Sequence, residues 1–223
     1  MFSKKAIQFY KSLQIPQNLP NQVTVMNPYD STVTFSLVEK FFLKFYNDDN
    51  KRTFIVGINP GRFGGGVTGV AFTDPVNLEE KCGIKNDLDK KQELSSRFVY
   101  KLIDEFGGAK KFYSKFFISA IYPLALIKDG KNYNYYDSQK VYKALKPQII
   151  KTLQEQIEFG ANDKVAISFG KKNAEYLKEI NSELKFFKEI ITFDHPRFIM
   201  QYRLKKLEHY LEEYVKILRE IAK

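Results

Sequence analysis

Four short apolar runs, each followed at once by residues that break regular structure, constrain the fold of this chain more than any other feature. They span residues 53–58, 116–121, 164–169 and 187–193. A continuous apolar run, without alternation, indicates a strand buried on both faces, as in a parallel sheet. Segments with helical spacing of apolar residues separate the runs. The sequence therefore predicts one α/β domain over residues 1–223, a three-layer α/β/α fold with a four-stranded parallel sheet.

The spacing of apolar residues and the positions of turn residues also predict the remaining elements. We expect a short strand around residues 23–25 and a turn of surface chain around Cys82. Helices are expected over 3–13, 32–47, 93–106, 137–159 and 171–180, and one last helix is expected from about 196 to the C-terminus.

A ligand site is expected where these strands end. In open parallel sheets the site lies outside the carboxyl ends of the strands. Here those ends carry Asn59-Pro60-Gly61, the segment 119–123, Gly170 and Asp194-His195-Pro196. All four segments are candidates for the walls of one crevice.

Charge and cysteine content narrow the class of protein. The 36 Lys and Arg residues exceed the 26 Asp and Glu residues, for a net charge of +10. This favours a polyanionic partner, nucleic acid first, although a Lys-rich proteome accounts for the charge equally well. A single cysteine excludes a disulfide framework, a cysteine-based zinc site and a four-cysteine iron–sulfur cluster. No stretch approaches the roughly 20 apolar residues of a membrane span, and no signal peptide is evident, so a cytoplasmic protein is expected.

The segment 61–69 is rich in glycine and follows the first predicted strand. Gly64, Gly66 and Gly69 match G-x-G-x-x-G, but no helix is expected to open there, which makes a dinucleotide loop improbable. The segment is either a flexible turn or a place where backbone approaches a ligand closely, since glycine has no Cβ.

Of the two histidines, His195 is the candidate for chemistry. It follows a predicted strand and precedes Pro196, a residue suited to the first turn of a helix. There it would either donate a hydrogen bond to a developing negative charge or serve as a structural histidine. His209 lies among helical apolar residues and is read as a surface or packing residue. Two histidines without cysteine partners make a zinc site improbable.

The residues around Asn59 resemble a known family. Residues 57–64 read G-I-N-P-G-R-F-G and residues 68–72 read T-G-V-A-F. They resemble G-M-N-P-G-P-F-G and T-G-V-P-F, the first motif of single-strand-selective monofunctional uracil-DNA glycosylases. Weaker similarities follow in the same order: V-M-N-P at 25–28, S-R-F at 96–98, Y-P-L at 122–124 and His195-Pro196.

This resemblance implies a DNA glycosylase of base excision repair that needs no metal or cofactor. Asn59 would position the water that attacks the sugar, His195 would stabilise the departing base, and Phe72 would stack on the flipped base. The pocket would be completed by Gly57, Ile58, Pro60, Gly61 and Phe63. Breaking an N-glycosidic bond leaves an anionic base, so a donor at the base and a snug pocket for an extruded nucleotide suit this chemistry.

Two departures from the family pattern affect the expected site. Where the family reads the uracil edge with Asn, gapless alignment gives Ala120 with Ser119 beside it, and Ser119 is expected to contact the base. The family's wedge loop is replaced by residues 197–203, in which Phe198 or Met200 would be the apolar wedge or, equally, the start of a buried helix face. Contacts to DNA are expected from Arg62, Gly64, Gly65, Arg197 and Arg203.

Three functions remain for test. The first is a monomeric glycosylase that removes uracil or a related deaminated or oxidised base from DNA. The second is a non-catalytic nucleic-acid-binding protein that uses the same basic crevice. The third is a small-molecule enzyme whose glycine-rich loop holds a nucleotide.

Overall fold

The centre of the molecule is a sheet in which every neighbouring pair of strands is parallel. The computed structural model describes residues 1–17, 19–20 and 22–223. The strand order is β3–β2–β6–β7, and the strands are Phe116–Ala120, Arg52–Gly57, Ala161–Phe169 and Glu189–Phe193. All four predicted strands are thus confirmed. β2 and β3 are buried along their whole length, which explains their continuous apolar sequence.

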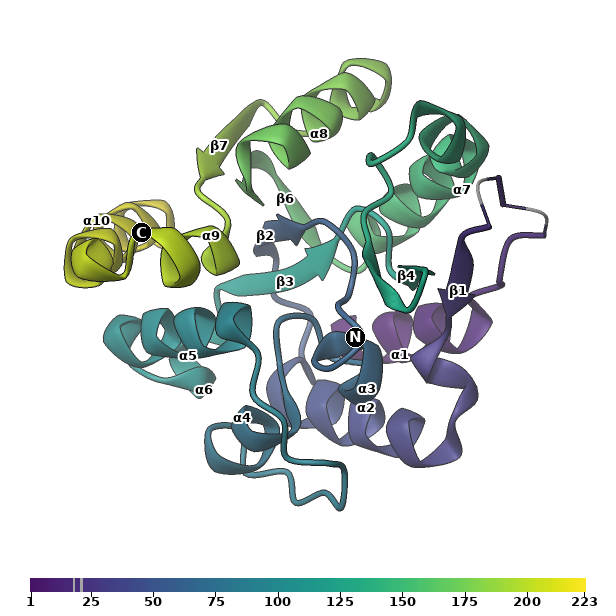
Figure 1. The fold of residues 1–223 in the computed structure, drawn as a ribbon. Helices are drawn as coiled ribbons and strands as arrows, with labels where there is room; N and C mark the ends of the chain where they lie inside the picture. The colour runs from purple at the N-terminus through teal and green to yellow at the C-terminus, as the bar shows by residue number, and fades with distance from the viewer. Residues whose placement is uncertain (18, 21) are drawn as a thin grey trace.

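Helices cover both faces of this sheet (Figure 1). On one face, Tyr214 of α10 stacks on Phe193 of β7 with ring centroids 3.8 Å apart, beside α5. On the other face, Phe2 of α1 packs edge-on against Phe117 of β3, α7 lies beside α1, and α8 lies beside α7. The three-layer α/β/α prediction is confirmed. These five helices are α1 (Phe2–Ser12), α5 (Leu94–Phe106), α7 (Gln139–Ile157), α8 (Lys171–Leu184) and α10 (Leu207–Ile221).

The remaining helices complete the chain around the sheet. They are η1 (Pro28–Asp30), α2 (Thr32–Phe45), α3 (Gly65–Thr68), α4 (Pro75–Glu80), α6 (Ala109–Tyr113), α9 (Pro196–Tyr202) and η2 (Leu204–Lys206). Ser31 caps α2, its Oγ accepting the Thr34 N–H. The expectation that no helix opens at the glycine-rich segment 61–69 is wrong at α3, which forms one helical turn within it, whereas residues 70–74 are irregular as expected.

The expectation of one continuous last helix is also wrong. The chain turns between α9 and α10 at Arg203, whose backbone (φ −131°, ψ 22°) leaves the helical region. No glycine or proline marks this break in the sequence. The break lets α9 pack against α5 while α10 continues along the sheet.

A second, smaller sheet was only partly predicted. The expected strand near residue 24 is β1 (Thr24–Met26), which pairs with a hairpin of β4 (Ala125–Lys128) and β5 (Lys131–Tyr133). Asp129 and Gly130 at the hairpin tip both have positive φ, as a tight two-residue turn requires. This hairpin reaches the carboxyl edge of the main sheet, where it forms one wall of the site described below.

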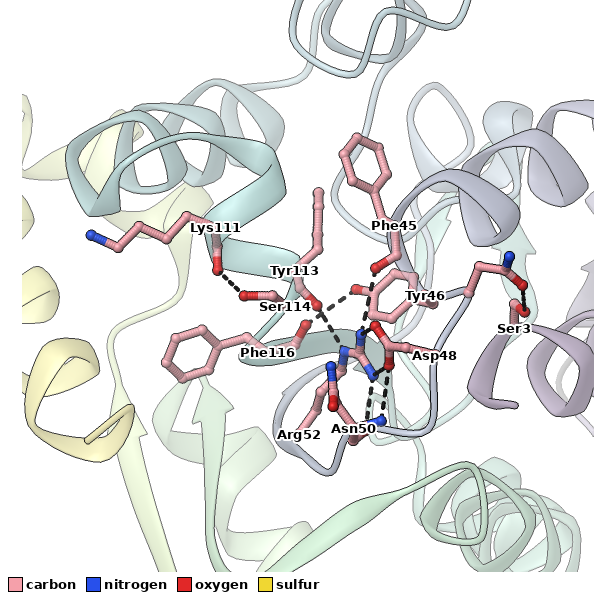
Figure 2. Close-up of polar contacts among 11 residues, drawn as sticks. Ser3, Phe45, Tyr46, Asp48, Asn50, Arg52, Lys111, Tyr113, Ser114 and Phe116 are labelled. Carbon is pink, nitrogen blue, oxygen red and sulfur yellow. Dashed lines mark hydrogen bonds and ion pairs between the residues drawn. The ribbon is translucent and has the colours of Figure 1, made fainter.

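A buried arginine, Arg52, lies at the amino end of β2, away from the carboxyl edge of the sheet, and binds several neighbouring segments there (Figure 2). Arg52, the first residue of β2, is fully buried. Its guanidinium pairs with both carboxylate oxygens of Asp48 at 2.9 and 2.8 Å, and its Nε donates to the Tyr113 carbonyl at 2.7 Å. Its guanidinium also stacks on the rings of Phe2 and Tyr46. One cation therefore links the turn before β2 to α1 and α6.

Cys82 is buried, and its expected place in a surface turn is wrong. The side chain is 1% exposed, and its Sγ lies 3.0 Å from the Tyr100 hydroxyl. The segment after α4 folds inward because the N–H groups of Cys82 and Ile84 bond to carbonyls of α4. Burial raises the pKa of the Cys82 thiol to about 12.

Within the described part of the chain, no helix is both long and apolar enough to span a bilayer.

Candidate active site

A crevice opens at the carboxyl edge of β2 and β3, where the fold predicts a ligand site. Its volume of about 730 Å³ lies in the range of small-ligand pockets. The loop after β2, the start of α5, the β4–β5 hairpin and α9 form its walls. The residues predicted for the site that line it are Ile58, Asn59, Pro60, Gly61, Arg62, Phe63, Gly65, Phe72, His195, Arg197 and Phe198.

Asn59 enters the crevice with its side-chain amide held at both ends. Its Nδ2 donates to the carbonyl of Tyr133 at 3.0 Å, and its Oδ1 accepts the N–H of Tyr135 at 3.2 Å. Each amide group can make one further hydrogen bond. The β4–β5 hairpin therefore orients Asn59 and leaves it able to bind a ligand.

Phe72 lies against the floor of the crevice, where Gly57 makes room for it. A Cβ at position 57 would approach the Phe72 Cζ to 2.8 Å. Phe72 has a positive φ of 53°, a strained conformation for a non-glycine residue. The buried hydroxyl of Thr68 holds the loop in this shape by donating to the Thr73 carbonyl and accepting the Val70 N–H. Gly57 was predicted to line the pocket, and instead it lies beneath the ring that does so.

His195 lines the crevice at the start of α9. It is the N-cap residue of α9, and its Nδ1 accepts the Arg197 N–H at 3.2 Å. The other nitrogen, Nε2, therefore carries the proton of the neutral ring. Burial, and secondarily the Arg197 charge, lowers the pKa of His195 to about 4. The imidazole is thus a neutral donor at physiological pH, with its ring 5.9 Å from that of Phe72.

Glu93 lines the crevice and was missed in the sequence. It lies beneath the glycine-rich loop, where a Cβ at Gly61 would come within 2.7 Å of its Oε1. Burial raises the pKa of Glu93, while hydrogen bonds from the backbone of Phe63 and Gly64 act in the opposite direction. Asp74, which follows this loop, is structural: its carboxylate caps α4 and accepts the Glu93 N–H at 3.0 Å.

Ser119 does not face the crevice, so its predicted contact with the base is wrong. Its hydroxyl points to the opposite face of the sheet and donates to Oε1 of Gln156 on α7. Ala120, the next residue of β3, lines the crevice instead. Successive residues of a strand face opposite sides, so a difference of one position decides which side chain meets the ligand.

Three other predicted contacts also lie outside the crevice. Met200 is buried at 6% exposure and belongs to the core, whereas Phe198 is 37% exposed. Gly64 lies behind the loop, where its carbonyl accepts N–H groups of α3. Arg203 is exposed at the rim and its guanidinium lies 5.1 Å from the ring of Phe198.

Exposed aromatic rings and cations surround the mouth of the crevice. Phe63 and Tyr202 are 42% and 61% exposed, in addition to Phe198. The Arg62 guanidinium covers the ring of Phe63 at 4.5 Å, so a cation and an aromatic ring occur together on both sides of the mouth.

In the described ranges, 1–17, 19–20 and 22–223, no group of three or more His, Cys, Asp or Glu side chains is arranged to hold a metal ion.

Comparisons with known proteins identify the family and the fold of this chain. The sequence model of the uracil DNA glycosylase superfamily matches residues 43–219. The crystal structure of wild-type SMUG2 from Pedobacter heparinus is similar over 99% of this chain and 97% of its own, with 39% identity and a TM-score of 0.94. No curated protein sequence matches.

Proposed function

Because the chain belongs to the uracil DNA glycosylase superfamily, we propose that its crevice hydrolyses the N-glycosidic bond of uracil or a related damaged base in DNA. The family resemblance predicted from the residues around Asn59 is confirmed by the superfamily match and by the 39% identity to SMUG2. The observation that carries the assignment of the site is the meeting of Asn59, Phe72 and His195 in one crevice.

The reaction needs three contributions from these residues. The target nucleotide is extruded from the DNA, and its base stacks on Phe72. The bond between C1′ and the base nitrogen breaks with its electron pair on the base. The oxygen of a water held by Asn59 Oδ1 then bonds to C1′, and the proton that this water loses goes to the departing base or to solvent.

His195 supports the departing base through hydrogen bonding. Its Nε2–H donates to the base oxygen on which negative charge develops. Because the pKa of His195 is lowered to about 4, the donor is a neutral imidazole over the whole physiological range. The Arg197 N–H bond to Nδ1 keeps the proton on the nitrogen that faces the ligand.

The rim of the crevice is suited to hold the DNA strand. Arg62, Arg197 and Arg203 would contact phosphates, and Phe198 would insert where the target base leaves the stack. Met200, being buried, has no part in this insertion. We extend the proposal to a monomer that acts in the cytoplasm on single- or double-stranded DNA.

Ala120 gives the base-binding end of the crevice a methyl group and no hydrogen-bonding side chain. A pocket that makes few hydrogen bonds to its ligand discriminates poorly between similar ligands. We therefore expect several deaminated or oxidised bases to be released.

The test is base release from single- and double-stranded oligonucleotides, each containing uracil, xanthine or an oxidised pyrimidine, with alkali cleavage of the product. Asn59→Ala and His195→Ala should each lower the single-turnover rate about 10²–10³-fold. His209→Ala, which changes the exposed histidine of α10, serves as the matched control and should keep the wild-type rate. Salt-sensitive DNA binding with no base released by the wild type would instead select a non-catalytic nucleic-acid-binding protein.

A further inference from the structure

We propose that Tyr135 and Asn173 are positioning residues that hold the Asn59 amide in the orientation needed for hydrolysis. This inference rests on the proposed function of the crevice. Neither residue lines the crevice, and both act through hydrogen bonds that end at Asn59.

The first link is the pair of backbone groups that bracket the amide. Tyr133 offers a carbonyl and Tyr135 offers an N–H, so only one orientation of the Asn59 amide satisfies both. In the flipped orientation, the Asn59 NH2 group would face the Tyr135 N–H, donor against donor. Its oxygen would face the Tyr133 carbonyl, acceptor against acceptor. The segment 133–135 therefore determines which Asn59 atom is presented to the attacking water.

The second link fixes this segment to the main sheet. The hydroxyl of Tyr135 donates to Oδ1 of Asn173 at 2.9 Å. Nδ2 of Asn173 donates to the Val56 carbonyl and to Oγ of Ser168, each at 3.1 Å. Val56 lies in β2, three residues before Asn59. The network thus runs from Asn59, in the loop that follows β2, back to Val56 of β2 itself.

Burial separates this network from an ordinary surface contact. Tyr135, Asn173 and Ser168 are all 0% exposed. Packing alone does not require the hydroxyl, because the Tyr135 ring already contacts those of Tyr136 and Tyr176 at 4.9 and 5.6 Å. Phenylalanine would keep the ring contacts and lose the attachment to Asn173.

A positioning role predicts a particular kinetic signature. Tyr135→Phe should lower kcat about 10-fold and leave KM within about 2-fold, because the binding surface is unchanged while the water is misplaced. Tyr142→Phe is the matched control. Tyr142 lies in the same aromatic cluster, and its hydroxyl bonds to Glu179, away from Asn59. It should retain the wild-type kcat.

The decisive measurement repeats the substitution in the Asn59→Ala background. If Tyr135 acts through Asn59, Tyr135→Phe should not lower the residual single-turnover rate of Asn59→Ala further. An equal loss in both backgrounds, or no loss in the wild-type background, would overturn the inference. Ser168→Ala, a milder change at the far end of the network, should give about a 3-fold loss with the same dependence on Asn59.

A measurement on the free protein separates this inference from the proposed function. The side-chain amide resonance of Asn59, identified by its loss in Asn59→Ala, should exchange slowly with solvent. The exchange should be faster in Tyr135→Phe and unchanged in Tyr142→Phe. Unchanged exchange in Tyr135→Phe would overturn the positioning role even if base release is confirmed. Failure of the wild type to release any base would contradict the proposed function and leave the exchange result to stand by itself.

Discussion

His195 owes its neutral state to burial at the end of β7, and this has a measurable consequence for stability. In the unfolded chain its pKa is close to 6.5, and in the folded protein it is lowered to about 4. As the pH falls below 6.5, the unfolded state takes up the proton first, so folding loses free energy until the pH reaches about 4. Above 6.5 both states are neutral and this contribution to the pH dependence vanishes.

We therefore predict that the wild-type protein loses about 2 kcal/mol of unfolding free energy between pH 7 and pH 4.5 relative to His195→Asn, which cannot titrate at that position. Urea denaturation at both pH values measures the difference. Parallel losses in the two proteins would show that His195 titrates normally in the folded state.

Gly57 is the residue on which the position of Phe72 depends. Gly57→Ala would force the new Cβ against the Phe72 ring, so we predict a loss of about 1–3 kcal/mol in unfolding free energy and a lower rate of base release. Thermal denaturation and single-turnover rates measure the two effects.

The double variant Gly57→Ala/Phe72→Leu separates packing from stacking on the base. It should recover much of the lost stability, because leucine is smaller than the displaced ring, and it should not recover the rate. Recovery of the rate would contradict the stacking role of Phe72.

Among single residues of the site, the sequence predicts those that lie in a continuous, recognisable motif or directly after a predicted strand. Asn59 and Phe72 follow one strand within a recognisable segment, and His195 follows another, so their convergence could be expected from topology. Ser119 and Ala120 show the limit, since the strand's alternation can be assigned only when its register is known. Glu93 shows a second limit, because nothing in a predicted helix start marks a carboxylate that will lie beneath a loop some thirty residues earlier.

At the scale of elements, the turn that leads into β2 depends on the pairing of Arg52 with Asp48. Asp48→Ala would leave the buried guanidinium without its anionic partner. We predict a loss of about 2–3 kcal/mol, less than for a fully buried pair because the Asp48 side chain is 36% exposed. Chemical denaturation measures the loss.

Asp49→Ala is the neighbouring control, since the Asp49 side chain is 79% exposed; it should cost less than about 0.5 kcal/mol. Base release should stay within about 2-fold of wild type in both variants below their unfolding transitions, because the turn lies at the end of the sheet opposite the crevice. Equal destabilisation by the two variants would contradict the special role of the Arg52–Asp48 pair.

The elements that the sequence predicts are those with a continuous apolar run or a long helical spacing of apolar residues. The central strands have such a run, the main helices have such a spacing, and both are found where expected. The β4–β5 hairpin has strands of four and three residues, too short for any period to be recognised. The sequence does not predict the break at Arg203, because no helix-breaking residue marks it. The break accompanies the packing of α9 on α5. The β4–β5 hairpin and α9 both form walls of the crevice. The sequence therefore predicts the residues at the ends of the central strands better than the walls around them.

At the scale of the molecule, the net charge of +10 makes DNA binding sensitive to salt. Each arginine that neutralises a phosphate contributes about one unit to the slope of log K against log salt concentration. We predict that Arg197→Ala and Arg203→Ala each reduce the magnitude of this slope by about 1, measured by fluorescence anisotropy on a labelled oligonucleotide.

Arg219→Ala provides the matched control for charge. It removes one positive charge, as the other two variants do, but Arg219 lies on α10 and its guanidinium donates to the Glu105 carbonyl at 3.0 Å. Its slope should equal that of the wild type. A uniform reduction in all three variants would mean that total charge, and not the rim of the crevice, determines binding.

The burial of Cys82 makes this protein convenient for spectroscopic labelling. The sequence contains one cysteine, and its thiol is enclosed and has a pKa of about 12, so at neutral pH it offers almost no thiolate to a maleimide dye. Lys91 is exposed, and its Nζ lies 5.5 Å from the ring centroid of Phe63 at the mouth of the crevice. A cysteine introduced there by Lys91→Cys would therefore take up a single fluorophore without prior removal of Cys82. Energy transfer from that dye to one on an oligonucleotide would then follow the arrival and departure of DNA at the crevice, one molecule at a time.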